Sequence, residues 1–245
     1  GDILVTEPVK KKSSTKEDNT VLTELRACGF RFKAGEKKGT FGIELETETI
    51  NASAYPNDFF SPTNDGEYEI GSKCWKAVTD GSLRNFGMEF ILKEPLEYTA
   101  ALEALDHFAS LTKGVKFIKN APATSTHVHV NMLNEDVLTM VNFLTLYTLL
   151  ENVLVDYSGE HRRSNLFALP IRVATSTERN IISLIKGFAI GEVTRLKFDL
   201  SQVKYAAINL EPLTRLGSLE LRSFRGEPDM KEVKTWVEMI NKILI

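Results

Sequence analysis

The stretch Thr126-His127-Val128-His129-Val130-Asn131 decides how the rest of the chain is interpreted. Its polar and apolar residues alternate, which predicts a β-strand with His127, His129 and Asn131 on one face and the valines on the other. The chain has only 4 histidines, and two of them stand here. Neutral imidazole ligates divalent metals and imidazolium donates to anions, so the pair suits metal or phosphate chemistry. Taken alone, the pattern fits an exposed strand face without a site equally well.

Two other segments repeat this alternation with carboxylates. The segment 41–46, Phe-Gly-Ile-Glu-Leu-Glu, places Glu44 and Glu46 on one strand face, about 7 Å apart by the rise of a strand. Further along the chain, Glu220 and Arg222 share a strand face in the same way, with leucines behind them. Each of these strands therefore has an apolar face for a core and a charged face for another purpose.

A further carboxylate follows the turn expected at Asp80-Gly81. Glu89 lies within the apolar run 87–91, Gly-Met-Glu-Phe-Ile. Like carboxylates side by side are unfavourable unless a cation lies between them. Alternating polarity in a single strand is the normal appearance of an antiparallel sheet. Four strands that all bring carboxylates or imidazoles predict a shared site.

Composition limits the classes of protein that fit. Hydrophobic residues make up 42% of the 245 residues and charged residues 26%, as in an ordinary globular protein. The net charge of −3 argues against a general nucleic-acid binder. Cys28 and Cys74 are isolated, which is typical of thiols in a reducing compartment. No 18-residue apolar stretch or signal peptide is recognisable. We therefore expect a cytoplasmic protein without a membrane partner.

Periodicity and turn residues predict the remaining elements. Residues 1–38 are expected to form an N-terminal arm, partly flexible, before one domain over 39–245. Helices are predicted over 21–30, 96–111 and 135–157, the last with Asn134 as its N-cap. Two further helices are predicted, one after a capping box at Thr175 and Glu178 and one that Pro228 opens. Strands are predicted over 41–49, 75–79, 87–92, 206–210 and 217–224, and a loop over 51–74 with a hairpin through 68–70. This order lacks a regular βαβ rhythm, so it favours an α+β fold with an antiparallel sheet.

An ordered set of short motifs then indicates a family. The motifs are Gly-x-Glu-x-Glu at 42–46, Asp-Gly-Ser at 80–82, Gly-x-Glu at 87–89, His-Val-His-Val at 127–130, Arg-x-x-Asn at 162–165, Lys-Tyr-x-Ala-x-Asn at 204–209 and Glu-x-Arg-x-Phe-Arg-Gly at 220–226. Over about residues 40–245 the chain resembles the amidoligases, often phage or bacterial proteins. They belong to the carboxylate–amine ligase superfamily of glutamine synthetase and glutamate–cysteine ligase.

The resemblance implies both a fold and an activity. The fold would be glutamine-synthetase-like α+β, a curved, mostly antiparallel β-sheet funnel with helices packed on its outer face. The activity would be ATP- and Mg²⁺-dependent formation of an amide bond through an acyl phosphate. The partners would be a carboxylate substrate, either an amino acid or a peptide-linked acid, and an amine. An oligomer is compatible with the sequence.

The resemblance also implies roles for individual residues. Glu44 and Glu46 are similar to ligands of two different metal ions, and the further metal ligands would be Glu89, His127 and Glu220. His129 resembles a group that contacts ATP phosphates. Arg222 resembles the arginine that clamps the substrate carboxylate, a task that suits a planar bidentate donor.

Other matched positions remain open between a functional and a structural role. Arg162 and Arg225 are candidates for phosphate contacts, and Asn165 and Lys204 for nucleotide contacts or for structural roles. Asp80 could bind metal, bind the incoming amine, or cap a turn. Longer nucleotide-binding loops and a Gly-rich phosphate loop are not recognisable in the sequence.

Two rival interpretations come from other classes of protein. A metalloenzyme could use His127, His129 and one glutamate as a facial triad for iron or zinc. A non-catalytic member could bind nucleotide or a partner protein, for example in phage assembly. The metalloenzyme interpretation gives no role to Arg222, Arg225 and the surplus glutamates. The non-catalytic interpretation gives no reason to keep paired carboxylates, whose repulsion lowers the stability of the fold.

Overall fold

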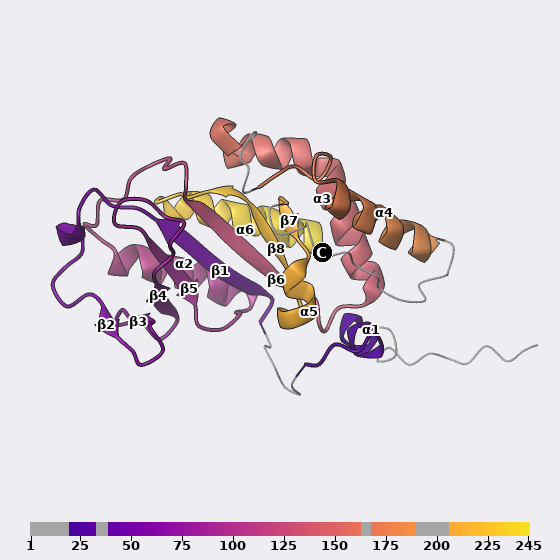
Figure 1. The fold of residues 1–245 in the computed structure, drawn as a ribbon, viewed down its shortest axis with the longest axis horizontal. Coiled ribbons are helices and arrows are strands. Elements are labelled where there is room, and N and C mark those ends of the chain that lie inside the picture. The colour runs from indigo at the N-terminus through magenta and orange to yellow at the C-terminus, as the bar shows by residue number, and fades with distance from the viewer. Residues whose placement is uncertain (1–19, 33–38, 163–167, 190–205) are drawn as a thin grey trace, which may run out of the picture.

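A single antiparallel sheet organises the molecule, whose computed structural model describes residues 20–32, 39–162, 168–189 and 206–245 (Figure 1). Its eight strands lie in the order β2-β3-β4-β5-β1-β6-β8-β7, and all neighbours are antiparallel. The strands are β1 Phe41–Thr47, β2 Ser61–Pro62, β3 Tyr68–Glu69, β4 Trp75–Val78, β5 Met88–Leu92, β6 Ser125–Asn131, β7 Ile208–Asn209 and β8 Ser218–Arg225. The predicted α+β class with an antiparallel sheet is confirmed.

Helices cover one face of this sheet. They are α1 Val21–Ala27, α2 Tyr98–Leu111, α3 Val137–Ser158, α4 Thr175–Ala189, α5 Glu211–Leu216 and α6 Met230–Leu244, with short 3-10 turns η2 Ala52–Ala54 and η3 Glu160–Arg162. In Figure 1, α2 and α6 lie behind the strands, and α3 and α4 lie together beside them. α3 also contacts β8 and α6, so it joins the covered side of the sheet.

The covered face of the sheet forms the hydrophobic core. Phe224 of β8 stacks on Trp236 of α6 at 5.0 Å between ring centroids, and both side chains are fully buried. On β4 and α2, Trp75 and Phe108 make a similar buried contact. The strand residues on this core face are the predicted ones: Ile43, Leu45, Phe90, Val128, Val130, Leu219 and Leu221. Complete burial of each large apolar side chain contributes about 1.5–3 kcal/mol.

The opposite face, which we call the polar face, carries charged side chains on the same strands. They are Glu44, Glu46, Glu89, His127, His129, Glu220 and Arg222. The strict alternation of side chains along a strand separates these residues from the core residues that stand between them.

A β-bulge interrupts the pairing of β6 with β8. Thr126 pairs with Phe224, but Val128 pairs with Leu221, so β8 has one residue more than β6 in this interval. An extra residue shifts the alternation of the strand that contains it. Phe224 therefore returns to the core face, although it is separated by only one residue from Arg222 on the polar face.

Several predicted helix boundaries are wrong by one or two residues. The N-cap of α3 is Asp136, not Asn134, because the Asp136 carboxylate accepts the backbone N–H of Thr139 at 2.7 Å. The N-cap of α6 is Asp229, so Pro228 lies before the cap and not in the first turn. α4 begins at Thr175 itself. In both corrected caps an aspartate supplies the acceptor that the first turn requires.

The predicted hairpin in the 51–74 loop is present. β2 pairs with β3 and β3 with β4, so the hairpin extends the sheet at the edge beyond β4. Tyr55, Phe59 and Phe60 join the buried Phe90 in an aromatic cluster beneath this edge. The loop is thus attached to the core by its aromatic residues.

Within the predicted N-terminal arm, α1 packs against the domain. The backbone N–H groups of Val21 and Leu22 donate to the carbonyls of Glu135 and Leu133, and Leu25 is fully buried. The rest of the arm, at 1–19 and 33–38, lies outside the described residues.

By length and composition, α3 is apolar enough to cross a membrane, the one such helix found among the described residues. Its most apolar window is 44% buried, and a core helix of a folded domain passes the same test. Leu149 and Val153 lie on its exposed side. The helix is therefore weak evidence for a membrane span.

Candidate functional site

The strand register brings the predicted metal-binding residues into one row across the polar face. Because β1 lies between β5 and β6, residues far apart in the sequence become cross-strand neighbours. The neighbouring pairs are Glu46 with Glu89, Glu44 with His127, and His129 with Glu220. Directly opposed side chains in a sheet stand about 5 Å apart, so this register alone concentrates four carboxylates and two imidazoles.

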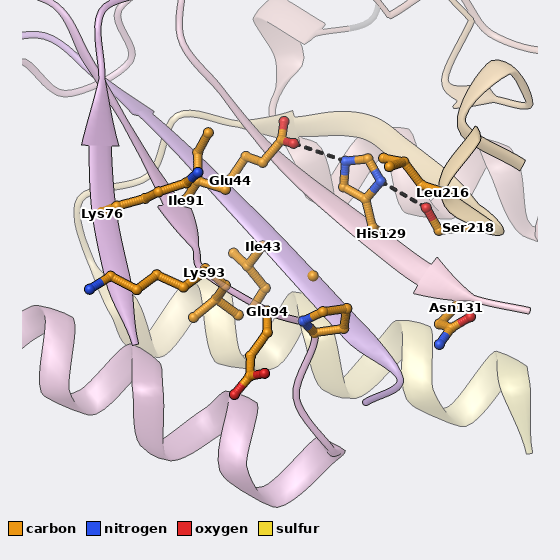
Figure 2. Close-up of a pocket in the computed structure, with 13 residues that line it drawn as sticks. Ile43, Glu44, Lys76, Ile91, Lys93, Glu94, His129, Asn131, Leu216 and Ser218 are labelled. Carbon is orange, nitrogen blue, oxygen red and sulfur yellow. Dashed lines mark hydrogen bonds and ion pairs between the residues drawn. The ribbon is translucent and has the colours of Figure 1, made fainter. Parts of the chain in front are cut away.

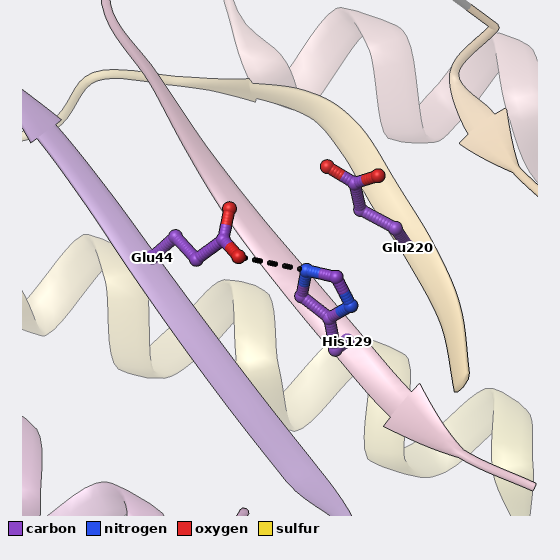
Figure 3. Close-up of side chains that lie close together, drawn as sticks. All are labelled: Glu44, His129 and Glu220. Carbon is purple, nitrogen blue, oxygen red and sulfur yellow. Dashed lines mark hydrogen bonds and ion pairs between the residues drawn. The ribbon is translucent and has the colours of Figure 1, made fainter. Parts of the chain in front are cut away.

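Glu44 lies at the centre of the row. Its Oε2 lies 3.0 Å from His127 Nδ1 and its Oε1 lies 3.1 Å from His129 Nε2. Burial alone would raise the pKa of Glu44, but hydrogen bonds and positive charge from both imidazoles outweigh burial and hold that pKa well below its ordinary value. Figure 3 shows Glu44 and His129 turned toward each other, with Glu220 on the next strand. Glu44 is therefore an ionised carboxylate shared between two imidazoles.

Glu89 behaves in the opposite way. Burial raises its pKa to about 8, and the negative charges of Glu44, Glu46 and Asp80 contribute to the rise. A carboxyl group with this pKa holds a proton at neutral pH unless a cation replaces the proton. This end of the row thus has more carboxylates than nearby positive charge can balance.

Glu220 is held firmly at the other end of the row. Its Oε1 accepts from an Arg222 guanidinium nitrogen at 2.6 Å, and its Oε2 accepts from Asn209 Nδ2 at 2.6 Å. The same Oε1 lies 3.3 Å from His127 Nδ1. Glu220 is 5% exposed, whereas the Arg222 side chain is 16% exposed. Arg222 therefore presents a cation at the edge of the acidic row.

The ligand atoms are close enough together to hold cations. Glu44, His129 and Glu220 offer one atom each within 4.8 Å of one another, and so do Glu44, Glu89 and His127. Each group combines two carboxylates with one imidazole. Oxygen-rich sets of this kind suit Mg²⁺ or Mn²⁺. The same closeness of the carboxylates contributes to the raised pKa of Glu89, and a divalent cation would offset it.

A pocket of about 230 Å³ borders the row on the His129 side (Figure 2). Gly42 forms part of it, and a Cβ at that position would approach His129 Cβ to 3.2 Å. Lys76 and Lys93 also line the pocket, but each is paired with a carboxylate, Glu67 at 2.5 Å and Glu69 at 2.6 Å, and Glu44 and Glu94 line the same pocket. The remaining lining residues include Ile91, Pro95, Asn131, Leu216 and Ser218. The pocket thus combines paired lysines, two carboxylates and the His129 imidazole, so an anionic ligand there would need a cation beside the carboxylates.

The two arginines predicted to bind phosphate, Arg162 and Arg225, donate hydrogen bonds to backbone carbonyls in this structure. Buried Arg162 donates to the carbonyls of Ser223 and Arg222 at 3.0 and 2.7 Å, and its pKa is lowered to about 10 mainly by burial. Arg225 donates to Glu227 at 2.7 Å and to the carbonyl of Tyr157 at 2.8 Å. Arg162 thereby supports the bulge that carries Arg222. Phosphate contacts by either arginine remain a prediction.

Of the remaining predicted residues, Asp80 lies in a turn, and two others are not described by the structure. Asp80 accepts the backbone N–H of Ser82 at 2.7 Å, as expected of a turn cap, and its charge also reaches Glu89. Asn165 and Lys204 lie outside the described residues.

Two serines were not predicted. Ser125 contacts both Glu46 and His127, and Ser218 Oγ lies 3.1 Å from His129 Nδ1. Both follow the alternation that selected their neighbours, since each stands two residues from a predicted ligand on the same strand. Extending the period-two pattern by one step would have found them.

A comparison with known families agrees with this geometry. The model of a family described as "putative amidoligase enzyme" matches residues 37–244. The matched range includes every residue of the row and the whole described sheet. No curated protein matches the chain.

Proposed function

This chain belongs to the family of putative amidoligase enzymes, and from that premise we propose that it is an ATP- and Mg²⁺-dependent ligase. It joins a carboxylate to an amine on a glutamine-synthetase-like fold. The observation that carries the proposal is the row from Glu89 to Glu220, with Arg222 at its edge. Four strands contribute to this row, and each keeps its other face for the core.

The row supplies the ligands for two Mg²⁺ positions. By the family resemblance, Glu46 and Glu89 belong to one position, and Glu44, His127 and Glu220 to the other. By distance alone, Glu44 groups with Glu89 and His127 and also with His129 and Glu220, so Glu44 is common to both groups. Support comes from the crowding of carboxylates: burial raises the pKa of Glu89 most, repulsion from Glu44, Glu46 and Asp80 adds to the rise, and a cation would relieve that repulsion. In phosphoryl transfer, Mg²⁺ neutralises phosphate charge and ATP supplies the group that activates the carboxylate as an acyl phosphate.

The nucleotide is proposed to occupy the pocket beside His129. His129 points into this pocket from β6. Lys76 and Lys93 line it as well, and a phosphate would compete for them with Glu67 and Glu69. A concave site with a few convergent polar groups is the usual form of a ligand pocket. Ser218 holds Nδ1 of His129, and Nε2, which contacts Glu44 in this structure, would donate to a phosphate oxygen once Glu44 binds Mg²⁺.

Arg222 is proposed to bind the substrate carboxylate. Its contact with Glu220 orients the guanidinium, and Arg162 holds its backbone carbonyl. A planar guanidinium binds a carboxylate bidentately and keeps its charge at all ordinary pH values. In this position, it would hold the acid where the amine can displace phosphate.

The donor chemistry favours this function over a facial-triad oxidase or hydrolase. The two closest groups each contain two carboxylates and one imidazole, whereas an iron or zinc triad uses two imidazoles and one carboxylate.

A thermal-stability experiment tests the proposal. A non-hydrolysable ATP analogue and Mg²⁺ together should raise the melting temperature, because a ligand that binds only the folded state stabilises it. Glu46→Gln and Glu220→Gln should abolish the shift, and Glu238→Gln on α6 should preserve it as the matched control. A shift that persists in both site variants would overturn the metal assignment, and stoichiometric iron or zinc in the purified protein would favour the facial triad instead.

A further inference from the structure

Ser125 connects the two halves of the acidic row. It is the first residue of β6, lies on the polar face and is 5% exposed. Its backbone N–H and its Oγ both donate to Glu46 Oε2, at 2.7 and 2.6 Å. The same Oγ lies 2.9 Å from His127 Nε2. One buried hydroxyl therefore contacts a carboxylate of one proposed metal position and an imidazole of the other.

The hydrogen count decides the direction of these contacts. A serine hydroxyl has one proton to donate and can accept through its lone pairs. Because that proton goes to the Glu46 carboxylate, the contact with His127 requires Nε2 to be the donor. Nε2 must then carry a proton, and it has no lone pair to offer a metal ion.

The consequence is that Nδ1 faces the ligands of the second position. Nδ1 lies 3.0 Å from Glu44 Oε2 and 3.3 Å from Glu220 Oε1. On the Glu46 side, two donors occupy Oε2. Oε1 is then the Glu46 oxygen with which a cation would interact. A hydrogen bond to the distal nitrogen commonly selects the metal-binding nitrogen of a histidine.

We propose that Ser125 is a positioning residue that presents His127 Nδ1 and Glu46 Oε1 to two neighbouring metal positions. Its hydrogen bonds to Glu46 and His127 connect a ligand of one position to a ligand of the other. The inference rests on the proposed function for the presence of the metals. The orientation of the ring, however, is a property of the metal-free protein and can be measured there.

Nitrogen-15 NMR of the imidazoles provides this measurement. The protein has 4 histidines, so a His127→Gln variant suffices to assign the His127 ring signals. Without Mg²⁺ both ring nitrogens face hydrogen-bond acceptors and should show the chemical shifts of protonated nitrogens. With Mg²⁺, Nε2 should keep its proton and Nδ1 should lose its proton. An unprotonated Nε2 in the wild-type protein would overturn the proposal.

Variants at two serines separate positioning from general structure. Ser125→Ala should change the His127 ring shifts and weaken Mn²⁺ binding about 10- to 100-fold, the usual loss for a partner of a metal ligand. Ser125→Thr keeps the hydroxyl and should restore both. Ser110→Ala is the control, because the Ser110 hydroxyl on α2 donates to the carbonyl of Asp106, and its loss should leave the His127 signals unchanged. Unchanged His127 shifts in Ser125→Ala would contradict the proposal.

The two proposals fail in different ways. If the wild-type protein binds no Mn²⁺ in electron paramagnetic resonance titrations, the proposed ligase function and the metal part of this inference fail together. The NMR result still decides whether Ser125 sets the orientation of the His127 ring.

Discussion

The two faces of the sheet are built from the same strands and have opposite energetics. On the core face, Leu45 and Val128 are buried among apolar partners, and every addition to the packing is favourable. On the polar face, Glu46 and His127 stand next to these residues in the sequence and are also almost completely buried. Their burial costs free energy, which hydrogen bonds offset in part and which the proposed cation would offset further. The comparison teaches that a buried residue on the core face contributes to stability, whereas a buried residue on the polar face indicates a chemical role.

The largest expected effect is on the core face. Phe224→Ala removes a ring that stacks on Trp236 and should lower the free energy of unfolding by about 3–5 kcal/mol. Urea denaturation measures the loss. At low temperature, where the variant remains folded, binding of Mg²⁺ and nucleotide should persist. Loss of binding in a demonstrably folded variant would show that the two faces are not independent.

The next effect concerns the polar face and depends on pH. The folded-state pKa of Glu89, about 8, lies above its ordinary value of 4.5, so the proton stabilises the folded metal-free protein. This contribution is complete below pH 4.5 and is lost as pH rises through 8. Stability of the metal-free protein should therefore decrease across this range, as measured by urea denaturation.

A glutamine at position 89 is the control for this pH dependence. Glu89→Gln cannot lose a proton and should flatten the decrease, and saturating Mg²⁺ should do the same in the wild-type protein, because the cation replaces the proton. An equally steep decrease in Glu89→Gln would assign the dependence to another group.

The smallest effect is expected where the backbone makes room for a polar-face side chain. Gly42→Ala places a Cβ 3.2 Å from His129 Cβ, which should cost about 1–2 kcal/mol of stability. Because the displaced side chain is His129, nucleotide affinity should fall more than stability does. Calorimetric titration with the ATP analogue and urea denaturation of the same variant provide the two measurements. Equal or smaller loss of affinity would remove His129 from the proposed nucleotide contacts.

Sequence alone predicted the faces of the strands well, for a simple physical reason. Side chains alternate along a strand, so Glu44 and Glu46 had to lie on the face opposite Ile43 and Leu45. Once the strands pair in one sheet, their charged faces coincide. The core residues and the antiparallel class follow from the same periodicity.

Details that depend on neighbouring strands were not predictable in this way. The bulge near Arg222 arises from the register between β6 and β8, and no pattern in the sequence of either strand predicts it. The backbone roles of Arg162 and Arg225 depend on which carbonyls the fold brings to them. At the ends of helices, Asp136 and Asn134 are both good caps by composition, and tertiary context selects between them.

The strand order has a consequence for folding while the chain is being synthesised. Glu44 is synthesised before Glu220, its neighbour across the row, and before Arg222. A nascent chain that ends before β8 has half of the row and no strand to close it. Such a chain exposes the free edge of β6, which can pair with other chains. The synthesis of β8 is therefore also the step that assembles the row and covers this edge.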